Sequence, residues 1–372
     1  MIRKVLVFHI GLLGDTIVSI PSLRAIRRHF GEETEITLLH NSHGSKLVNP
    51  REVLEGLSLV DKFIEYGFSI DKIKRLKIMS QLLFKLRGGR FETVVSLLPC
   101  FRFADAIERD KKFFRWCGIK KQLGFRSYDY KTEIYPQAAN GLPDYVPQEA
   151  RRRLARMEEI GIKTFPETDL SPPFIKLSDK ILEKTENWLA PQRRFPRRAL
   201  VAICPSTNMP AKEWTTERFA EIGRRLLALD KYELIIIGGN DTIETGEKLI
   251  GIWGEGINAA GKLSVLESGA VLQKCNFMIG LDTGTMHLAS ALNVPTVSLH
   301  SSHNNPGEWF PLGKGHVVLR HSVPCAGCRL EICDVPNHPC MKEIGVEDVW
   351  AAIQQFMLNG ASRTEDWREI LV

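Results

Sequence analysis

The chain has 372 residues, of which 44% are hydrophobic and 25% charged, a composition that suits two globular domains and excludes extended disorder. Its formal net charge of +6 is too small to indicate a nucleic-acid partner, although it is compatible with an anionic ligand or membrane surface. No segment has the ~18 successive apolar residues that a membrane span needs, and residues 1–8 imitate a signal peptide without a cleavage site after them. We therefore expect a cytoplasmic protein.

The first half of the chain alternates strand-like and helix-like segments. An apolar, β-branched run at 4–10 predicts a strand, and a glycine turn leads from it into residues 16–30, whose apolar side chains follow helical spacing. Further strands are predicted at 35–39, 62–66 and 93–98. This alternation predicts a parallel sheet with helices on both faces.

The segment 70–90 is basic and amphipathic, with seven basic residues and Asp71 as its one acid. Its apolar residues recur at helical spacing: Ile73, Leu76, Met79, Leu83 and Leu86. Such a helix can lie on an anionic membrane, or its apolar face can belong to a domain core. We expect the core arrangement, and the basic-aromatic patch at 110–116 has the same two interpretations.

A proline-rich, aperiodic stretch at 162–176 predicts an interdomain linker. The α/β pattern then restarts, with strands expected at 199–204, 233–238, 277–281 and 296–300, and helices at 216–229, 263–274, 283–292 and 347–357. We therefore expect an N-terminal domain at 1–165, a C-terminal domain at 176–358, and a tail at 359–372 that could pack back on the first domain. Ligands of such pairs usually bind in the cleft between the domains, beyond the carboxyl ends of the strands.

The most informative segment is the strand-to-helix turn Asp282-Thr283-Gly284-Thr285. Backbone N–H groups at a helix start lack intrahelical partners, and the helix dipole favours an anion there. Gly284 would let a phosphate approach the backbone closely, and His287, one turn into the helix, could donate to the same phosphate. Alternatively, Asp282 or Thr283 only caps the helix and His287 fills space in the core.

Gly11, Gly14 and Asp15 form a matching turn in the first domain. The glycines do not have the spacing of a dinucleotide-binding loop. Asp15 could act as a general base at the start of a helix, or it could only cap that helix. In the second domain, Lys212 lies in a loop between a strand and a helix, where its point charge would suit a diphosphate; a solvated surface lysine is the alternative.

The eight cysteines divide into two sets. Four are scattered in apolar positions, as expected of reduced core thiols: Cys100, Cys117, Cys204 and Cys275. The other four are clustered as Cys325-x2-Cys328-x4-Cys333-x6-Cys340. Four thiolates in a short loop could bind structural zinc or iron. Their spacing fits neither a zinc ribbon nor a bacterial ferredoxin, so packing thiols are the alternative.

Together these motifs resemble the bacterial heptosyltransferases of glycosyltransferase family nine. The resemblance covers about residues 5–350 and rests on the opening at 5–27, the Lys212-x-Trp214 loop, the motif at 282–296 and the cysteine segment. It implies a GT-B fold, in which two Rossmann-like domains face each other across a cleft. Acceptor would bind the N-terminal domain and a nucleotide-sugar donor the C-terminal domain.

The resemblance also implies residue roles and substrates. Asp15 would be the general base, with Gly11 and Gly14 shaping its turn, and Lys212 would contact the donor phosphates. The other implied donor contacts are Asp282 beside the sugar and Thr283, Gly284, Thr285 and His287 around the diphosphate. Family members transfer a heptose from an ADP-sugar, with inversion, to a lipid-linked saccharide of the lipopolysaccharide inner core at the inner face of the cytoplasmic membrane. No Asp-x-Asp motif is placed to hold a metal, so we expect neither a metal nor another cofactor.

Some alternatives stay open. No motif fixes the nucleotide base, and Asn240, Asp241 and Glu244 are only candidates for contacts with the nucleoside, so another nucleotide sugar or acceptor is an alternative. An epimerase would share the architecture but would need further carboxylates and histidines that the motifs do not supply. A catalytically silent nucleotide-sugar-binding protein would keep the 282–287 turn and tolerate the loss of Asp15, which is present here.

Overall fold

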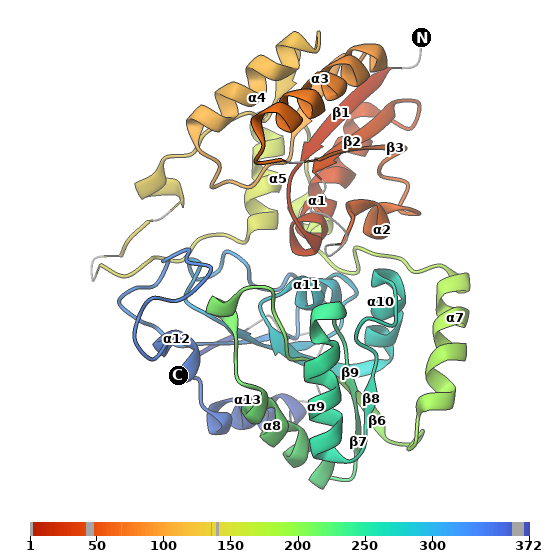
Figure 1. Cartoon of the computed structure of the whole chain (residues 1–372), viewed down its shortest axis with the longest axis vertical. Helices are drawn as coiled ribbons and strands as arrows, with labels where there is room; N and C mark the ends of the chain where they lie inside the picture. The colour runs from red at the N-terminus through yellow and green to blue at the C-terminus, as the bar shows by residue number, and fades with distance from the viewer. Residues whose placement is uncertain (1–2, 42–47, 68, 135, 139–140, 359–367) are drawn as a thin grey trace. The chain divides into compact units, whose positions relative to one another are not determined.

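A computed structural model describes residues 3–41, 48–67, 69–134, 136–138, 141–358 and 368–372 (Figure 1). The chain divides into two compact units, which are described separately below. The first comprises Met1–Pro136 and Pro147–Ser171, and the second comprises Gln137–Val146 and Pro172–Val372. In the described part of the chain, no helix is both long enough and apolar enough to cross a bilayer.

The first unit contains a five-stranded parallel sheet in the order β3-β2-β1-β4-β5. Its strands are β1 (Lys4–His9), β2 (Glu35–Asn41), β3 (Lys62–Tyr66), β4 (Thr93–Ser96) and β5 (Lys121–Leu123). The central strand β1 pairs Val5 with Ile36 on one side and with Thr93 on the other. A central parallel strand is covered on both faces, which explains why β1 is a continuous apolar run rather than an alternating one.

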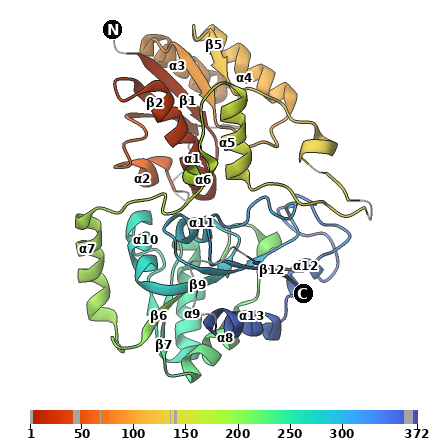
Figure 2. The same cartoon turned by 180° about the vertical axis from the view of Figure 1, so that it is seen from behind.

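Helices cover both faces of this sheet (Figures 1 and 2). The main ones are α1 (Leu13–Phe30), α3 (Lys72–Gly89), α4 (Ala104–Trp116) and α5 (Glu149–Glu159), and the short ones are α2 (Pro50–Leu54) and α6 (Pro166–Asp169). On one face, Leu82 of α3 and Phe114 of α4 pack with Leu6 and Val94 of the sheet. Helices α1 and α5 pack against each other on the opposite face.

Helix α3 forms where the sequence predicts it, and the prediction that its apolar face is core is confirmed for Leu86 but wrong for Ile73 and Leu76. Ile73 is 81% exposed and Leu76 is 73% exposed, whereas Leu82 and Leu86 are buried. The helix has two apolar stripes, and the sheet takes the one through Leu82 and Leu86 because only that stripe points toward the strands.

The second unit contains a seven-stranded parallel sheet in the order β12-β11-β10-β9-β6-β7-β8. Its strands are β6 (Ala199–Cys204), β7 (Tyr232–Ile236), β8 (Ile257–Asn258), β9 (Cys275–Leu281), β10 (Thr296–His300), β11 (Val317–Arg320) and β12 (Arg368–Leu371). Helices α8 (Thr216–Ala228), α9 (Ile243–Trp253) and α13 (Val346–Leu358) pack together over one face, and α7 (Asp179–Leu189), α10 (Val265–Lys274) and α11 (Gly284–Ala291) lie on the other. Between β11 and α13 lies α12 (Pro339–Lys342).

The C-terminal tail adds a strand to the sheet of the second unit. Of the segment 359–372, residues 359–367 lie outside the described part, and Arg368–Leu371 form strand β12. This strand pairs in parallel with β11 in the second unit, Val317 opposite Arg368. The tail thereby completes the unpaired backbone groups at the edge of β11, and its packing on the first domain stays a prediction.

Each sheet has a point at which the chain order reverses. In the first unit it lies between β1 and β4, and in the second between β6 and β9. Loops that leave the two central strands there diverge to opposite sides, which opens a crevice at the carboxyl edge of the sheet. The turn after β1 carries Asp15, and the loops after β6 and β9 carry Lys212 and Asp282. The sequence motifs therefore lie at the positions where this topology binds ligands.

Candidate functional site

The turn after β1 is shaped around Asp15. Gly11 has a φ of +151°, and a Cβ on it would lie 2.2 Å from the Cβ of Asp15. Only glycine therefore allows the backbone to pass this close to the carboxylate. Asp15 Oδ2 accepts the backbone N–H of Leu12 at 3.1 Å, so Asp15 does contribute to the start of α1, as the capping interpretation requires.

A buried arginine holds the other oxygen of this carboxylate. Arg153 of α5 is fully buried and donates from Nη2 to Asp15 Oδ1 at 2.9 Å, while its Nη1 donates to Ser19 Oγ at 2.6 Å. Its Nε donates to Glu149 Oε1 at 2.9 Å. Burial works against the charge of Arg153, but Glu149 and Asp15 outweigh it and raise its pKa. The guanidinium therefore fixes Asp15, whose side chain remains 19% exposed.

His9, at the end of β1, is a buried neighbour of this pair. Burial, and after it the charge of Arg153, lowers the pKa of His9 to about 4. The ring is therefore neutral at neutral pH. Neither ring nitrogen has a hydrogen-bond partner among the described residues.

The second unit brings Lys212 and Asp282 together. Lys212 ends a short 3₁₀ turn after β6, and its Nζ donates to Asp282 Oδ2 at 2.6 Å. The Lys212 side chain is only 13% exposed, so its interpretation as a solvated surface lysine is wrong. Burial disfavours the charged form of Asp282, but Lys212, His300 and His287 together outweigh it and lower the pKa of Asp282 to about 2. The result is a buried, charged pair at the edge of the sheet.

The turn after β9 consists of partly exposed residues. Thr283, Gly284 and Thr285 are partly exposed, whereas Asp282 before them and Met286 after them are buried. No side-chain hydrogen bond caps α11, and the Asp282 carboxylate is directed to Lys212 instead. The capping interpretation of this turn is therefore not supported, and the helix presents its first amides and its positive dipole end at a reachable position.

Histidines surround Asp282. His287 Nε2 lies 4.0 Å from Asp282 Oδ1, and the ring packs edge-on against Trp309 at 5.7 Å, so it also fills space in the core. His300, at the end of β10, is buried, and burial lowers its pKa to about 4. Asp282 and His300 line a cavity of ≈10 Å³, which has room for about one water.

The nucleoside candidates lie on the next strand. Asn240 and Asp241 are exposed in the turn after β7, and Glu244 is exposed at the start of α9. Since β7 adjoins β6 in the parallel sheet, this turn leaves the same edge as the Lys212 loop.

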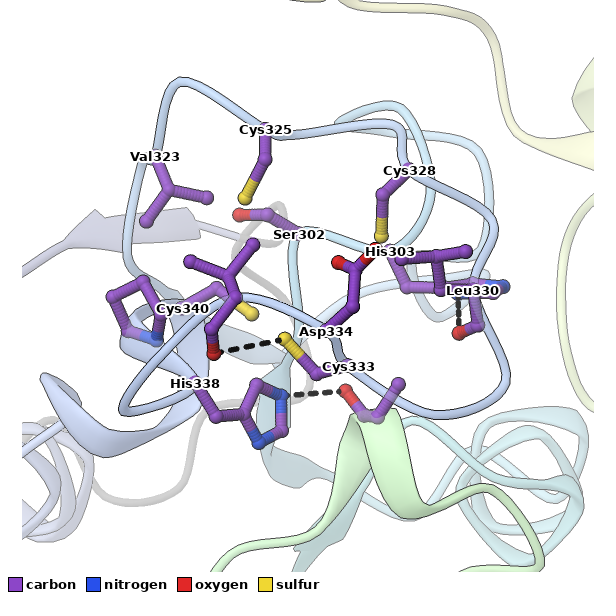
Figure 3. Close-up of a pocket in the computed structure, with 13 residues that line it drawn as sticks. Ser302, His303, Val323, Cys325, Cys328, Leu330, Cys333, Asp334, His338 and Cys340 are labelled. Carbon is purple, nitrogen blue, oxygen red and sulfur yellow. Dashed lines mark hydrogen bonds between the residues drawn. The ribbon is translucent and has the colours of Figure 1, made fainter.

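The four clustered cysteines line one cavity of ≈30 Å³ together with His303 and His338 (Figure 3). No three Cys, His, Asp or Glu side chains of the described residues are arranged to hold a metal ion. Burial raises the pKa of Cys340 to about 11, and it also raises the pKa of Cys325. Both thiols are therefore protonated at neutral pH in the metal-free protein, and the metal-binding and packing interpretations of the cluster both stay predictions. The scattered cysteines are buried and free, as predicted: Cys100, Cys117, Cys204 and Cys275.

The cysteine segment also supports the loop that carries Lys212. Ala211 N donates to the carbonyl oxygen of Glu331 at 3.0 Å, and His338 Nε2 donates to the carbonyl oxygen of Ala211 at 3.0 Å. Two main-chain groups next to Lys212 are thus held by residues more than a hundred positions later. This support gives the segment a structural role whether or not it binds a metal.

Three residues of these sites were not found from the sequence. Arg153 lies 138 positions from Asp15, and its only signal is a run of three arginines in a helix. His9 and His300 both end buried strands that precede candidate turns, and that position is a signal that could have identified them.

Comparisons with known proteins show which proteins this chain resembles. Residues 163–338 match the family model described as glycosyltransferase family 9 (heptosyltransferase). Lipopolysaccharide heptosyltransferase 2 of Escherichia coli K12 is 25% identical over 161 residues, which are 41% of this chain and 45% of that protein. The chain thus matches less than half the length of this curated relative.

Two solved structures share the fold over nearly the whole chain. A glycosyl transferase family 9 protein from Veillonella parvula superposes with a TM-score of 0.75 at 19% identity, covering 96% of this chain and 98% of its own. The E. coli ADP-heptose lps heptosyltransferase II superposes with a TM-score of 0.66 at 18% identity, covering 97% of this chain and 100% of its own. These likenesses confirm the expected α/β fold class with GT-B architecture.

Proposed function

We propose that the chain, whose residues 163–338 match the glycosyltransferase family 9 model, transfers a heptose or a related sugar from an ADP-sugar to an acceptor hydroxyl. One observation carries this proposal: the buried Lys212–Asp282 pair lies at the strand-order reversal of the second unit, inside the matched region, with the amides of α11 accessible in the turn that follows Asp282. The related proteins' names, lipopolysaccharide heptosyltransferase 2 and ADP-heptose lps heptosyltransferase II, support the donor and a saccharide acceptor.

The donor diphosphate would bind the turn at 283–285. Backbone amides and the dipole of α11 favour an anion there, and His287 stands one turn into the helix. Lys212 has three donor hydrogens, of which Asp282 uses one, so two remain for phosphate oxygens. Asp282 thus keeps the lysine in position while the lysine binds the ligand.

Asp15 would act as the general base. Its two oxygens hold Leu12 N and Arg153, which leaves lone pairs for an acceptor hydroxyl. The acceptor oxygen attacks the anomeric carbon from the side opposite the leaving group, its proton passes to Asp15, and the bond from that carbon to the diphosphate oxygen breaks. The sugar is therefore transferred with inversion of configuration.

Charge that develops on the leaving diphosphate would be stabilised by Lys212 and the α11 amides. Preorganised donors of this kind act more strongly on the transition state than on the ground state. The proposed reaction therefore requires no metal ion. We further propose a lipid-linked acceptor at the inner face of the cytoplasmic membrane, as expected for the assembly of the lipopolysaccharide core.

A transfer assay with a panel of nucleotide sugars tests this function. The full chain is incubated with ADP-, UDP- and GDP-sugars and a lipopolysaccharide core acceptor, and product is followed by mass spectrometry. We expect product with an ADP-sugar, and none from Asp15→Asn under the same conditions. Binding of ADP in calorimetry without transfer to any acceptor would instead identify a catalytically silent binding protein, and transfer from another nucleotide would correct the donor.

A further inference from the structure

The outer face of α3 exposes large apolar side chains. Ile73 is 81% exposed, Leu76 73% and Phe84 73%, and Ile70, just before the helix, is 88% exposed. A helix turns about 100° per residue, so Ile73 and Phe84 point in nearly the same direction, opposite to the buried Leu82. The helix therefore carries one apolar stripe for the sheet and a second one for something outside the unit.

The charges on this helix all have the same sign. The segment Lys72–Gly89 contains six basic residues and no acidic residue. By helical geometry, Lys77 and Arg87 share the outer face with Ile73 and Phe84, and Lys74 lies at its edge. Apolar side chains within a basic border are the pattern of a helix that lies on an anionic lipid surface.

The neighbouring helix α4 also exposes an aromatic and a basic side chain. Helices α3 and α4 lie side by side over the same face of the sheet (Figure 1), and both contribute to its core. Helix α4 ends at Trp116, which is 67% exposed, and the adjacent Arg115 is also exposed. An amphipathic aromatic ring beside a cation suits the boundary between lipid and water.

We propose that the outer face of α3 docks the protein on the surface of an anionic lipid bilayer. Ile73, Leu76 and Phe84 enter the headgroup region, and the bordering lysines and arginines contact lipid phosphates. A second copy of this chain is a poorer occupant, because a symmetric contact would place six positive charges against six. The docking needs neither donor nor acceptor, so it holds or fails independently of the proposed transfer.

Vesicle co-sedimentation of the full chain tests the docking. We expect binding to vesicles of phosphatidylcholine with phosphatidylglycerol, little binding to phosphatidylcholine alone, and weaker binding as salt is added. Lys74→Gln/Lys77→Gln should weaken binding by roughly 30-fold, because the variant loses two basic side chains that contact lipid phosphates. Ile73→Ser/Phe84→Ser should weaken it by about tenfold or more.

Matched control variants on the second unit distinguish binding by the α3 face from nonspecific binding of the chain to vesicles. Ile332→Ser removes an apolar side chain that is 71% exposed, and Lys180→Gln/Lys231→Gln removes two exposed charges. These variants should bind vesicles as the unchanged chain does. The α3 variants should also keep their rate on a water-soluble acceptor, which would show that the proposed transfer site is intact.

Three results would overturn the proposal. One is equal binding of the α3 variants and the unchanged chain to anionic vesicles, and another is equal binding of the unchanged chain to neutral and anionic vesicles. The third is a dimer in light scattering that Ile73→Ser/Phe84→Ser converts to monomer, which would make the face a contact between copies.

Discussion

Replacing Lys212 by methionine removes the cation of a buried ion pair while keeping most of the side-chain volume. The Asp282 carboxylate, 6% exposed, would then lose its closest positive partner. Its pKa of about 2, against an ordinary 3.8, corresponds to roughly 2 kcal/mol of stability, present above pH 4 and lost as the pH falls through 2. Breaking a buried pair from one side costs about 3–5 kcal/mol. We therefore expect Lys212→Met to lose ~2–5 kcal/mol of folding free energy at neutral pH.

The same variant should bind ADP weakly, but instability alone could produce that result. The double variant Lys212→Met/Asp282→Asn removes both charges and should recover most of the lost stability, because no unpaired carboxylate remains. It should not recover ADP binding, since the donor to the diphosphate is still missing. Urea unfolding and calorimetry with ADP on the two variants and the unchanged chain measure both quantities. Unchanged ADP affinity in the folded double variant would refute the assignment of Lys212 to the donor site.

Three further outcomes are expected. Asp15→Asn should leave ADP binding intact and reduce transfer by ~10²–10⁴-fold, as loss of a general base does; a near-normal rate would leave Asp15 as a cap only. Arg153→Met should destabilise the chain by about 3–5 kcal/mol in thermal or urea unfolding, because Glu149 and Asp15 lose their buried cation; unchanged stability would contradict the described pairing. Transfer should survive EDTA, whereas rapid loss restored by Mg²⁺ would reveal a catalytic ion, and slow loss with a lower Tm would place a structural metal at the cysteines.

The regular elements were predictable where the sequence pattern is local. The strands at β1, β6 and β10 and the helix α8 lie within a residue or so of their predicted bounds, because apolar periodicity and flanking turns determine them. The short strands β5, β8 and β11 were not predicted. Each of these strands has only two to four residues, which is too short to show a periodic pattern. Such a strand forms because the neighbouring strand of the sheet offers it backbone partners.

The exposed face of α3 shows a different limit. Ile73, Leu76, Met79, Leu83 and Leu86 have helical spacing, which correctly predicts a helix but does not say which side meets the sheet. Of this set, Leu86 is buried, together with Leu82 outside it, whereas Ile73 and Leu76 are exposed. Where apolar residues cover more than one side of a helix, only the tertiary structure decides which side becomes core.

Asp15 can both cap α1 and act as a base, because its two carboxylate oxygens make different contacts. Oδ2 accepts the Leu12 amide at the start of α1, and Oδ1 accepts Arg153, so the cap and the ion pair do not compete. Each contact fixes the carboxylate in one direction, and together they hold it still without covering it, since 19% of the side chain stays exposed. A base must be within hydrogen-bond reach of the proton it removes, in a fixed orientation. The capping contact that makes Asp15 look structural in the sequence is therefore part of what would orient it for catalysis.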